Sequence, residues 1–403
     1  MRSNFTGILV AVFVLVGIYT AYQLGTGNSV FGQDRLGALS EAELRTAAED
    51  LTSRNQIDAI LQLGVRPGDL SKTVPVLAKL ATVHNEMIKN AADSSLQLIG
   101  APAAEHIRPF MEENTTKGFR VSCSALRAIG PGSKIYINEL RELLQADDTT
   151  HRKCGLYALQ GMGMEAQPAM EEIIACVLDK DLNNQCMACR ILENFGPDAI
   201  EAQDALLEVQ KNGGPSTRGW AALVLGAIGP TSSSVDVAEL LAKQLQPRED
   251  GRPISPIEQQ RVLTGLGYLG PEATKALPTV REKLTGRNKF VQGHAAFALW
   301  KITGDSEEAG AVFRKLLNDS AMVNEAVFLV GKMGPDAISL APTIANSLKS
   351  SQPAIRELAA TAIGNMGSGA AAYQNQIKAL YSDNDPLVRM AARKAMQSLK
   401  EDK

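Results

Sequence analysis

The stretch LGYLGPEATKALPTV, residues 266 to 280, has the form of a phrase that returns along this 403-residue chain. LENFGPDAIEAQDAL occupies residues 192 to 206, and LVGKMGPDAISLAPT occupies residues 329 to 343. Each version contains an apolar residue, a Gly-Pro pair and a small residue two positions after the proline. A phrase that returns in this way predicts an array of structural repeats.

The spacing of the phrase is nearly constant when the residue that closes it is taken as a reference. The reference residues are Gly100, Gly130, Gly163, Gly196, Gly229, Gly270, Thr303, Gly334, Gly367 and Lys400. Successive references lie 30 to 33 residues apart, except for the 41 residues between Gly229 and Gly270. A period of this length is typical of arrays in which each repeat is one supersecondary unit.

Columns counted from the reference predict two helices in each repeat. The positions one and four residues before it are large and apolar, and the position eight before it is small in nine of ten repeats. These offsets share one face of an α-helix. The reference glycine can end this helix in the left-handed C-cap geometry, and the proline that often follows suits the first turn of the next helix. A second apolar column ten residues after the reference indicates that next helix.

Each phrase is therefore predicted to be the turn between two antiparallel helices. A single helix pair cannot cover its own apolar stripe, whereas stacked neighbours bury a continuous core. The predicted fold class is an all-α array of about ten helix pairs.

Two segments near the end of the chain resemble HEAT repeats, in the short variety named after bilin-lyase proteins. They are AIRELAATAIGNMGSGA, residues 354 to 370, and PLVRMAARKAMQSL, residues 386 to 399. The family pattern places an Asp shortly before Val-Arg-x-x-Ala-x-x-Ala, and the residues that correspond to it are Asp385, Val388, Arg389, Ala392 and Ala395. The resemblance covers about residues 80 to 400. It implies a right-handed α-solenoid (an α-α superhelix) whose inner helices line a binding surface, and a scaffold or adaptor function.

Arginines stand in the same position of other repeats, eleven residues before the reference, at Arg152, Arg218 and Arg356. We expect each of them to bond to a carboxylate or to the backbone of an adjacent repeat. These arginines should then hold the stack together, although binding of an acidic partner is the alternative.

The first 33 residues are predicted to be a signal anchor or a signal peptide with a short linker. No charged residue lies between Arg2 and Asp34. The apolar stretch from Phe5 to Gly25 is long enough to cross a bilayer. Either alternative places the repeats outside the cytoplasm, in a protein that is membrane-anchored or exported.

The remaining chain is predicted to have two parts. Residues 34 to 79 should form an irregular helical cap in which Ser40 and Glu43 make a capping box. Residues 80 to 403 should form the repeat array. The eight extra residues of the long spacing fall in a Pro- and Gly-rich insertion near 244–260, which is expected to be a surface loop.

Composition and residue types argue against several classes of site. The net charge of −3 implies no nucleic-acid partner. None of the four histidines is followed by Glu, so the repeated His-Glu pairs of the iron-binding hydroxylases that resemble this fold are missing, and we expect no metal or cofactor. Cys186 and Cys189 form a C-x-x-C in mid-helix with no second pair nearby. We expect them to be buried apolar residues, and a redox or metal-binding pair is the alternative.

A stripe on the inner helices is the candidate partner-binding site. It combines aromatic, apolar and basic residues at positions nine, six and two before the reference in four neighbouring repeats: Trp220, Leu223, Arg261, Tyr268, His294, Phe297 and Phe328. Exposed aromatic rings with arginine are typical of binding hot spots. Padding of the core between repeats is the alternative explanation for the same residues.

These features favour a non-enzymatic scaffold or adaptor that binds another protein through the inner face of the solenoid. The partner would be a protein or a peptide, with membrane attachment if the N-terminal segment is uncleaved. The alternative is a lyase or chaperone-like protein that acts on a tetrapyrrole or on the prosthetic group of another protein. That alternative predicts a bound pigment, or activity that depends on Cys186 or Cys189.

Overall fold

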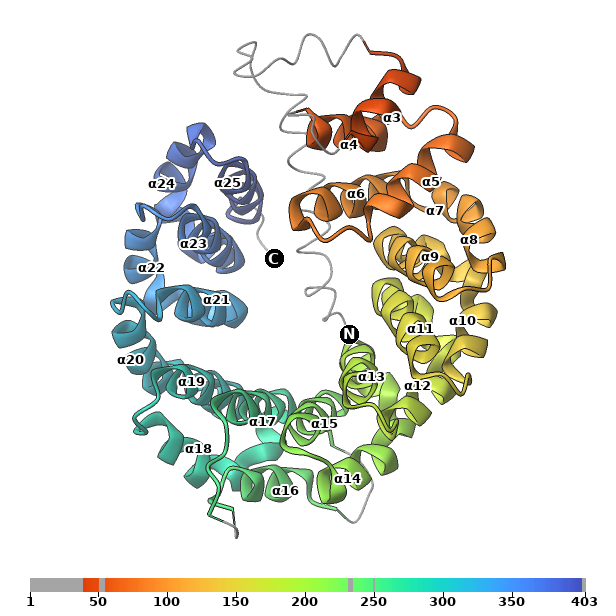
Figure 1. The fold of residues 1–403 in the computed structure, drawn as a ribbon. Coiled ribbons are helices and arrows are strands. Elements are labelled where there is room, and N and C mark those ends of the chain that lie inside the picture. Colours follow the sequence, from red (N-terminus) through yellow and green to blue (C-terminus); the bar gives the residue numbers. More distant parts are fainter. Residues whose placement is uncertain (1–38, 51–54, 231–234, 249–250, 401–403) are drawn as a thin grey trace. The chain divides into compact units, whose positions relative to one another are not determined.

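The computed structural model describes residues 39–50, 55–230, 235–248 and 251–400, and all the regular elements in these ranges are helices (Figure 1). The described chain divides into two compact units. Unit 1 ends at Phe195 and unit 2 begins at Gly196. The all-α fold that the repeat predicts is confirmed within these ranges.

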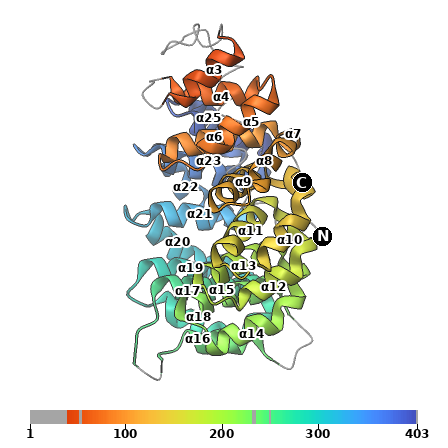
Figure 2. The ribbon, with the colours of Figure 1, turned by 45° about the vertical axis from the view of Figure 1, so that its right-hand side comes forward.

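Unit 1 begins with α3 (Glu41–Glu49), α4 (Gln56–Val65) and α5 (Leu70–Leu80). Its inner helices, which end at the reference residues, are α6 (Glu86–Ile99), α9 (Thr116–Ile129), α11 (Thr149–Met162) and α13 (Leu182–Phe195). The outer elements between them are α7 (Ala101–Ala104), η1 (Glu105–Ile107), α8 (Arg108–Glu112), η2 (Gly130–Tyr136), α10 (Ile137–Leu144), η3 (Gly163–Ala169) and α12 (Met170–Val177). The inner helices follow one another side by side as a separate layer (Figures 1 and 2).

Unit 2 repeats this arrangement. Its inner helices are α15 (Pro215–Ile228), α17 (Pro256–Leu269), α19 (Lys289–Thr303), α21 (Val323–Met333), α23 (Pro353–Asn365) and α25 (Pro386–Ser398). Its outer elements are η4 (Gly196–Ala202), α14 (Gln203–Asn212), α16 (Val237–Gln244), η5 (Gly270–Ala276), α18 (Leu277–Leu284), α20 (Ser306–Leu317), η6 (Gly334–Leu340), α22 (Ala341–Ser347), η7 (Gly367–Tyr373), α24 (Gln374–Ala379) and η8 (Leu380–Ser382).

The reference glycines end the inner helices with positive φ, as predicted, but their ψ differs from the expected left-handed value. Gly130 has φ 75° and ψ −135°, and Gly270 has φ 60° and ψ −135°. This conformation is almost closed to residues with a Cβ atom. In the repeat that carries Thr303 as its reference, the helix continues through Thr303. Gly304 then supplies the left-handed cap, with φ 72° and ψ −2°.

The element after each reference also differs from the expected simple helix. In most repeats a seven-residue 3-10 helix follows the glycine before the outer α-helix starts, as in η2 and η5. The proline after the glycine fits this tighter turn, because its φ is already restricted to helical values.

The predicted columns form the core. Leu126, Leu159 and Leu192, which stand four residues before their references, are fully buried. The closest contacts between neighbouring inner helices, however, involve other positions. A Cβ atom placed on Gly226 would lie 2.1 Å from the carbonyl oxygen of Gly265, so the backbones of α15 and α17 touch directly. Small residues three and five positions before the reference therefore set the helix spacing.

The N-terminal predictions are resolved in part. The capping box of Ser40 and Glu43 is present at the start of α3, which confirms that prediction. The apolar segment from Phe5 to Gly25 lies outside the described residues. Among the helices that are described, none is both long and apolar enough to cross a membrane. The right-handed superhelix that the resemblance implies stays a prediction.

Candidate protein-binding face

The exposed side of the inner helices of unit 2 carries the candidate site. Positions two, six and nine residues before each reference recur on α15, α17, α19 and α21 and carry both buried and exposed side chains. From the exposed or partly buried ones we take the aromatic rings and the cations, Trp220, Arg261, Tyr268, Lys301, Phe328 and Lys332, and name them the unit 2 aromatic face.

Trp220 on α15 and Arg261 on α17 form a stacked pair. The guanidinium carbon of Arg261 lies 4.1 Å from the centre of the Trp220 ring. Arg261 Nη1 also donates a hydrogen bond of 3.4 Å to the carbonyl oxygen of Ser216. Both side chains are partly buried, so the pair joins two neighbouring helices while part of it contacts solvent.

Tyr268 and Phe328 are the exposed rings of the face. The exposed fraction is 37% for Tyr268 and 44% for Phe328, which is high for aromatic side chains. The Lys332 ammonium lies 4.8 Å from the centre of the Phe328 ring, one helical turn away on α21. Rings that a cation holds in place and that remain accessible are suited to contact a partner.

Three of the predicted residues are buried. Leu223, His294 and Phe297 have exposed fractions of 5%, 3% and 3%. The expectation that these side chains line an exposed surface is therefore not met, because they pack between helices. The Phe297 ring lies 5.6 Å from that of Trp300, and His294 stacks edge-on against Phe290 at 4.9 Å. A role for these three residues in partner binding stays a prediction.

His294 has a polar neighbour at the edge of the core. Its Nε2 lies 3.0 Å from Glu325 Oε1, but their relative direction is unfavourable for a hydrogen bond. Among the described residues, Nδ1 of His294 has no hydrogen-bond partner. This pair supports α19 against α21 from beneath the aromatic face.

The insertion is anchored at its base by a buried charge. Glu258, on the first turn of α17, has an exposed fraction of 1%. Its carboxylate accepts a hydrogen bond of 3.2 Å from Gln244 Nε2 and lies 3.5 Å from Arg218 Nη2. Arg248, in the insertion itself, makes a hydrogen-bonded ion pair with the same carboxylate. The base of the loop is therefore fixed to both α15 and α17.

The predicted loop is partly helical. Pro256 and the residues after it form the first turns of α17, so the expected loop boundary near residue 260 is too late. Gly251, Arg252 and Pro253 are exposed, as expected for a surface loop.

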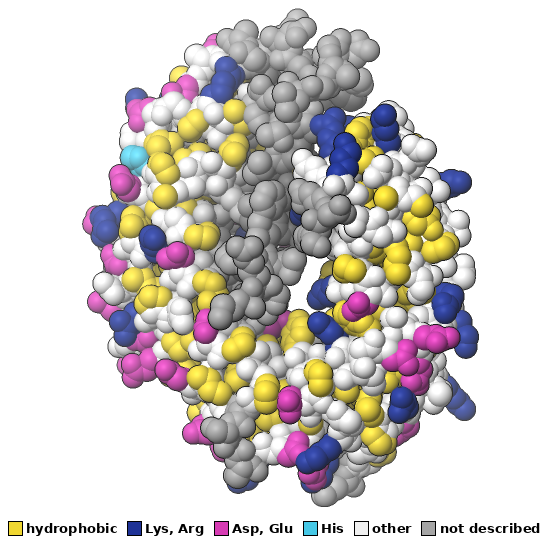
Figure 3. All heavy atoms as spheres, turned by 180° about the vertical axis from the view of Figure 1, so that it is seen from behind, with side chains coloured by type: hydrophobic (Ala, Val, Ile, Leu, Met, Phe, Trp, Pro, Cys, Tyr) yellow, Lys and Arg dark blue, Asp and Glu magenta, His cyan; other side chains and the backbone are white. Residues whose placement is uncertain are grey.

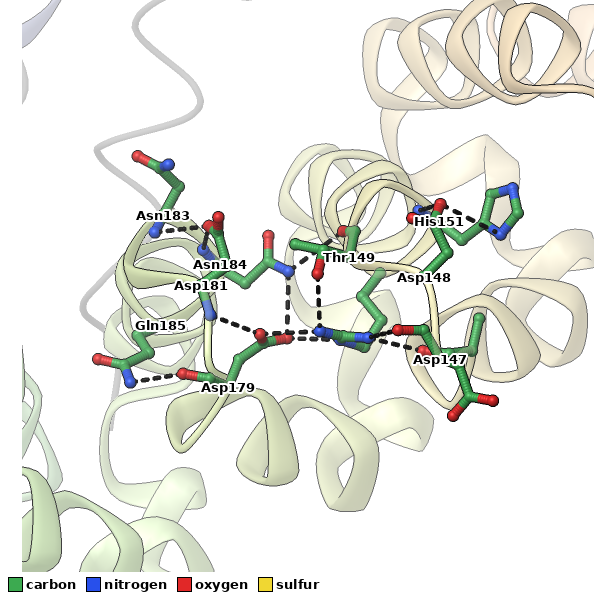
Figure 4. Close-up of polar contacts among 11 residues, drawn as sticks. Asp147, Asp148, Thr149, His151, Asp179, Asp181, Asn183, Asn184 and Gln185 are labelled. Carbon is green, nitrogen blue, oxygen red and sulfur yellow. Dashed lines mark hydrogen bonds and ion pairs between the residues drawn. The ribbon is translucent and has the colours of Figure 1, made fainter.

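The arginines in the repeated position hold neighbouring repeats together, as predicted. Arg152 Nε donates to Asp179 Oδ2 at 2.6 Å, and Nη2 donates to Oδ1 at 2.9 Å. Asn184 and the Asp181 amide also donate to Asp179, so its carboxylate is the centre of a polar network (Figure 4). Arg356 and Asp383 form the same two-bonded ion pair in unit 2, with two contacts of 2.7 Å. We name this arginine–aspartate ion pair the clamp.

The clamp controls the protonation of Asp179. Burial alone would raise the pKa of this carboxyl group. The hydrogen bonds from Arg152, the Asp181 amide and Asn184 outweigh burial and hold the pKa at about 2. The same balance lowers the pKa of Asp383, where the hydrogen bonds from Arg356 contribute most. Both groups therefore remain charged at neutral pH, as a structural ion pair requires.

Nothing in the described part of the chain forms a metal site. No cluster of three or more His, Cys, Asp or Glu side chains there is arranged to hold a metal ion. Cys189 is buried and Cys186 is partly buried on α13, which agrees with their predicted packing role. A redox role for these two cysteines stays untested.

Sequence reasoning missed two members of the aromatic face. Lys301 and Lys332 occupy the same column as Tyr268, two residues before the reference, on the next two inner helices. Both are exposed. The column position that Tyr268 shares with both lysines is the sequence signal that indicates them. On the side of the molecule that Figure 3 shows, charges of both signs are intermixed with hydrophobic side chains.

Comparison with known proteins finds similar solved structures but no family. No family model and no curated protein matches it. Solved structures that are similar include the complex of CpcE and CpcF of phycocyanin lyase from Nostoc sp. PCC7120, with 22% identity, a TM-score of 0.45, and coverage of 65% of this chain and 94% of that one. Kap95 in the Kap95:Nup1 complex has 13% identity and a TM-score of 0.44, over 96% of this chain and 61% of that one.

Kap121p bound to Nup53p has 13% identity and a TM-score of 0.42, over 89% of this chain and 45% of that one. The chain thus spans less than two thirds of both Kap proteins. At these TM-scores the likeness says nothing about what the chain binds. The repeated helix pairs of both units carry the architecture by themselves, and the HEAT-like interpretation of the sequence is confirmed as a description of the fold.

Proposed function

We propose that this chain is a non-enzymatic scaffold that binds a protein partner on the unit 2 aromatic face. The exposure of Tyr268 on α17 and of Phe328 on α21, two inner helices separated by α19, is the observation that carries the proposal. Leaving two aromatic rings in water forgoes the free energy of their burial, and a partner that covers the rings recovers it.

The surrounding residues suit this role. Trp220 and Arg261 are held by their mutual stacking, so little side-chain freedom is lost when a partner covers them. Lys301 and Lys332 add positive charge at the rim, where charge steers association more than it increases affinity. The anchored insertion lies next in sequence to α17, so it offers a second contact for the same partner.

The proposal is tested by replacing the rings. Full-length chain with Trp220→Ala, Tyr268→Ala and Phe328→Ala is compared with wild type in capture from the native membrane fraction. Captured proteins are identified by mass spectrometry, and the affinity of each one is then measured directly. We expect the triple variant to bind the partner at least about 30-fold more weakly, since aromatic hot spots typically contribute about 2 kcal/mol or more.

A matched control uses exposed apolar residues outside the face. Ile200 on η4 and Ile338 on η6 are exposed in the same unit. Alanine at both positions should leave partner binding unchanged. If the control variant loses as much affinity as the ring variant, or if the ring variant binds as wild type does, the assignment of the face is wrong.

We also propose that the repeats lie outside the cytoplasm, held or exported by the N-terminal apolar segment. The uncharged stretch from Phe5 to Gly25 is the observation that supports this location. If the repeats are anchored, protease added to intact cells should degrade them. If they are exported, they should be present in the medium. Protection of the repeats until the cells are lysed would contradict the proposal.

A further inference from the structure

The inner helices of unit 1 expose a face of a different chemistry from that of unit 2. On α9, α11 and α13 the charged residues that point away from the core are Lys117, Arg120, Lys153 and Arg190, and all of them are exposed. Within the described residues, no acidic side chain occupies the same columns of these three helices. We name this set the unit 1 basic face. It is positive although the whole chain has a net charge of −3.

A cleft lies at one end of this face, beside α5 and α9. It has a volume of about 360 Å³ and is lined by Lys79, Thr82, Lys117, Arg120 and Val121. Three of these five residues are cations and none is a carboxylate. A concave site with such a lining is suited to hold an anionic group.

Two acidic residues near the face already have partners of their own. Asp93 on α6 makes an ion pair with Arg127, and Asp148 lies 3.6 Å from His151 Nδ1. Among the described residues, Lys117, Arg120 and Lys153 make no ion pair. Clustered cations without partners repel one another, so an anionic ligand would relieve that repulsion as well as adding its own contacts.

Arg120 and Lys153 lie close enough to act on the same neighbour. A hydrogen bond with Cys123 lowers the pKa of the Cys154 thiol, and the charges of Lys153 and Arg120 lower it further. Two neighbouring repeats therefore place their cations around one point on α11. The basic face therefore extends at least from α9 to α11.

We propose that the unit 1 basic face binds an acidic, extended segment of a partner protein. Neighbouring packed helices are about 8–10 Å apart. Three residues of an extended chain span a similar distance, since each residue adds about 3.3 Å. The segment that fits best has an acidic residue at every third position, so that successive carboxylates meet cations from successive repeats.

A nucleic acid fits this face less well than an acidic peptide. Single-stranded nucleic acids are usually held by stacking of bases on aromatic rings along a basic groove. Tyr157 is the one aromatic residue in the exposed columns of α9, α11 and α13, and Arg127 already stacks on it at 4.7 Å. The net negative charge of the chain would also repel a long polyanion.

The test uses a labelled peptide in which Glu-Gly-Ser is repeated four times, and full-length chain. We expect measurable binding at low salt that weakens as the salt concentration rises. A peptide of the same composition with its four glutamates consecutive should bind several-fold more weakly, because it can meet cations of one or two repeats only. A peptide with Lys in place of Glu should not bind.

The variant Lys117→Glu, Arg120→Glu and Lys153→Glu should reduce the affinity at least about tenfold, since three favourable contacts become repulsive. The matched control is Lys72→Glu, Lys134→Glu and Lys180→Glu. It changes the net charge of the same unit equally, at exposed residues outside the face. The control should keep most of the affinity.

Several outcomes would overturn the proposal. They are an equal loss in the two triple variants, equal binding of the spaced and consecutive peptides, and tighter binding of a single-stranded oligonucleotide of the same charge. The alanine variants of the unit 2 aromatic face provide a separate check. They should bind the acidic peptide as wild type does, so this proposal and the proposed function can fail independently.

Discussion

The two units share one repeat skeleton and differ in what the skeleton exposes. The inner helices of unit 1 present Lys117, Arg120 and Lys153, whereas those of unit 2 present Tyr268 and Phe328 beside lysines. The buried columns are alike in both units. The comparison shows that packing restricts the columns facing the neighbouring helices, while the columns facing solvent are free to take the chemistry that a ligand requires.

The units also show how one clamp tolerates an insertion. In unit 1 the clamp joins Arg152 to an aspartate that follows the next outer helix. At the insertion in unit 2, Arg218 meets Glu258 on the next inner helix, and Arg248 from the loop completes the cluster. A carboxylate near the repeated arginine is thus retained although its residue, helix and sequence spacing all change.

The largest effect is expected from breaking the clamp. Arg152→Ala should lower the free energy of unfolding by about 3 kcal/mol, because it leaves the buried Asp179 carboxylate without its cation. Arg356→Ala should have a similar effect in unit 2. Arg281→Ala, which breaks an exposed pair with Glu308, is the control and should cost much less, because solvent screens exposed pairs. Urea denaturation measures the free energy of unfolding of all three variants. Equal losses of stability would show that buried ion pairs contribute no more than the exposed one.

The next effect concerns the helix contact at Gly226. Gly226→Ala should destabilise unit 2 by about 2 kcal/mol or more, because the added Cβ meets the backbone of Gly265. Gly161→Ala should do the same in unit 1, where the Cβ would lie 2.1 Å from the carbonyl oxygen of Arg127. Urea denaturation of both variants compares the two units directly. If only one of the two variants kept the stability of wild type, the inner helices of that unit could move apart without losing stability.

A smaller effect should appear as a dependence on pH. The pKa of Asp179 is about 2 in the folded chain, below its ordinary value of 3.8. Its contribution to stability is therefore present above about pH 3.8 and is lost as the pH falls toward 2. The stability difference between wild type and Asp179→Asn should narrow by about 1 kcal/mol between pH 6 and pH 3.

The exposed Asp204 provides the control for this measurement. The gap between wild type and Asp204→Asn is measured over the same pH range, and a gap that narrows as much as that of Asp179→Asn would contradict the role of the ion pair with Arg152. A gap for Asp179→Asn that widens on acidification would contradict the direction of its pKa shift.

The smallest effect has the opposite sign. A Cβ atom on Gly310, inside α20, would lie no nearer than 3.7 Å to its neighbours, at Arg314 Nη1 and Leu340 Cδ2. Gly310→Ala should therefore stabilise unit 2 by about 0.5–1 kcal/mol, since alanine favours the helix more than glycine. Thermal unfolding would show it as a small rise in the midpoint. A lower midpoint instead would mean that α20, like α15, needs a glycine to pack closely against its neighbours.

Part of the site could be predicted from the sequence and part could not. The column positions correctly placed Trp220, Arg261, Tyr268 and Phe328 on one side of the inner helices. They did not separate these residues from Leu223, His294 and Phe297, which share the same columns but are buried. Burial depends on the neighbouring helices, and the sequence of one repeat does not specify how closely the next one packs.

The sequence by itself determined the helix pairs, their order and the residues that end them. Those features follow from local rules: periodicity selects the buried face, and glycine alone takes the backbone angles of the turn. The tertiary structure decided which solvent-facing columns remain exposed, which carboxylate each arginine meets, and which cations gather on one face. Those outcomes depend on contacts between residues about 27 or more positions apart, such as Arg152 with Asp179, and such contacts exist only once neighbouring repeats have packed.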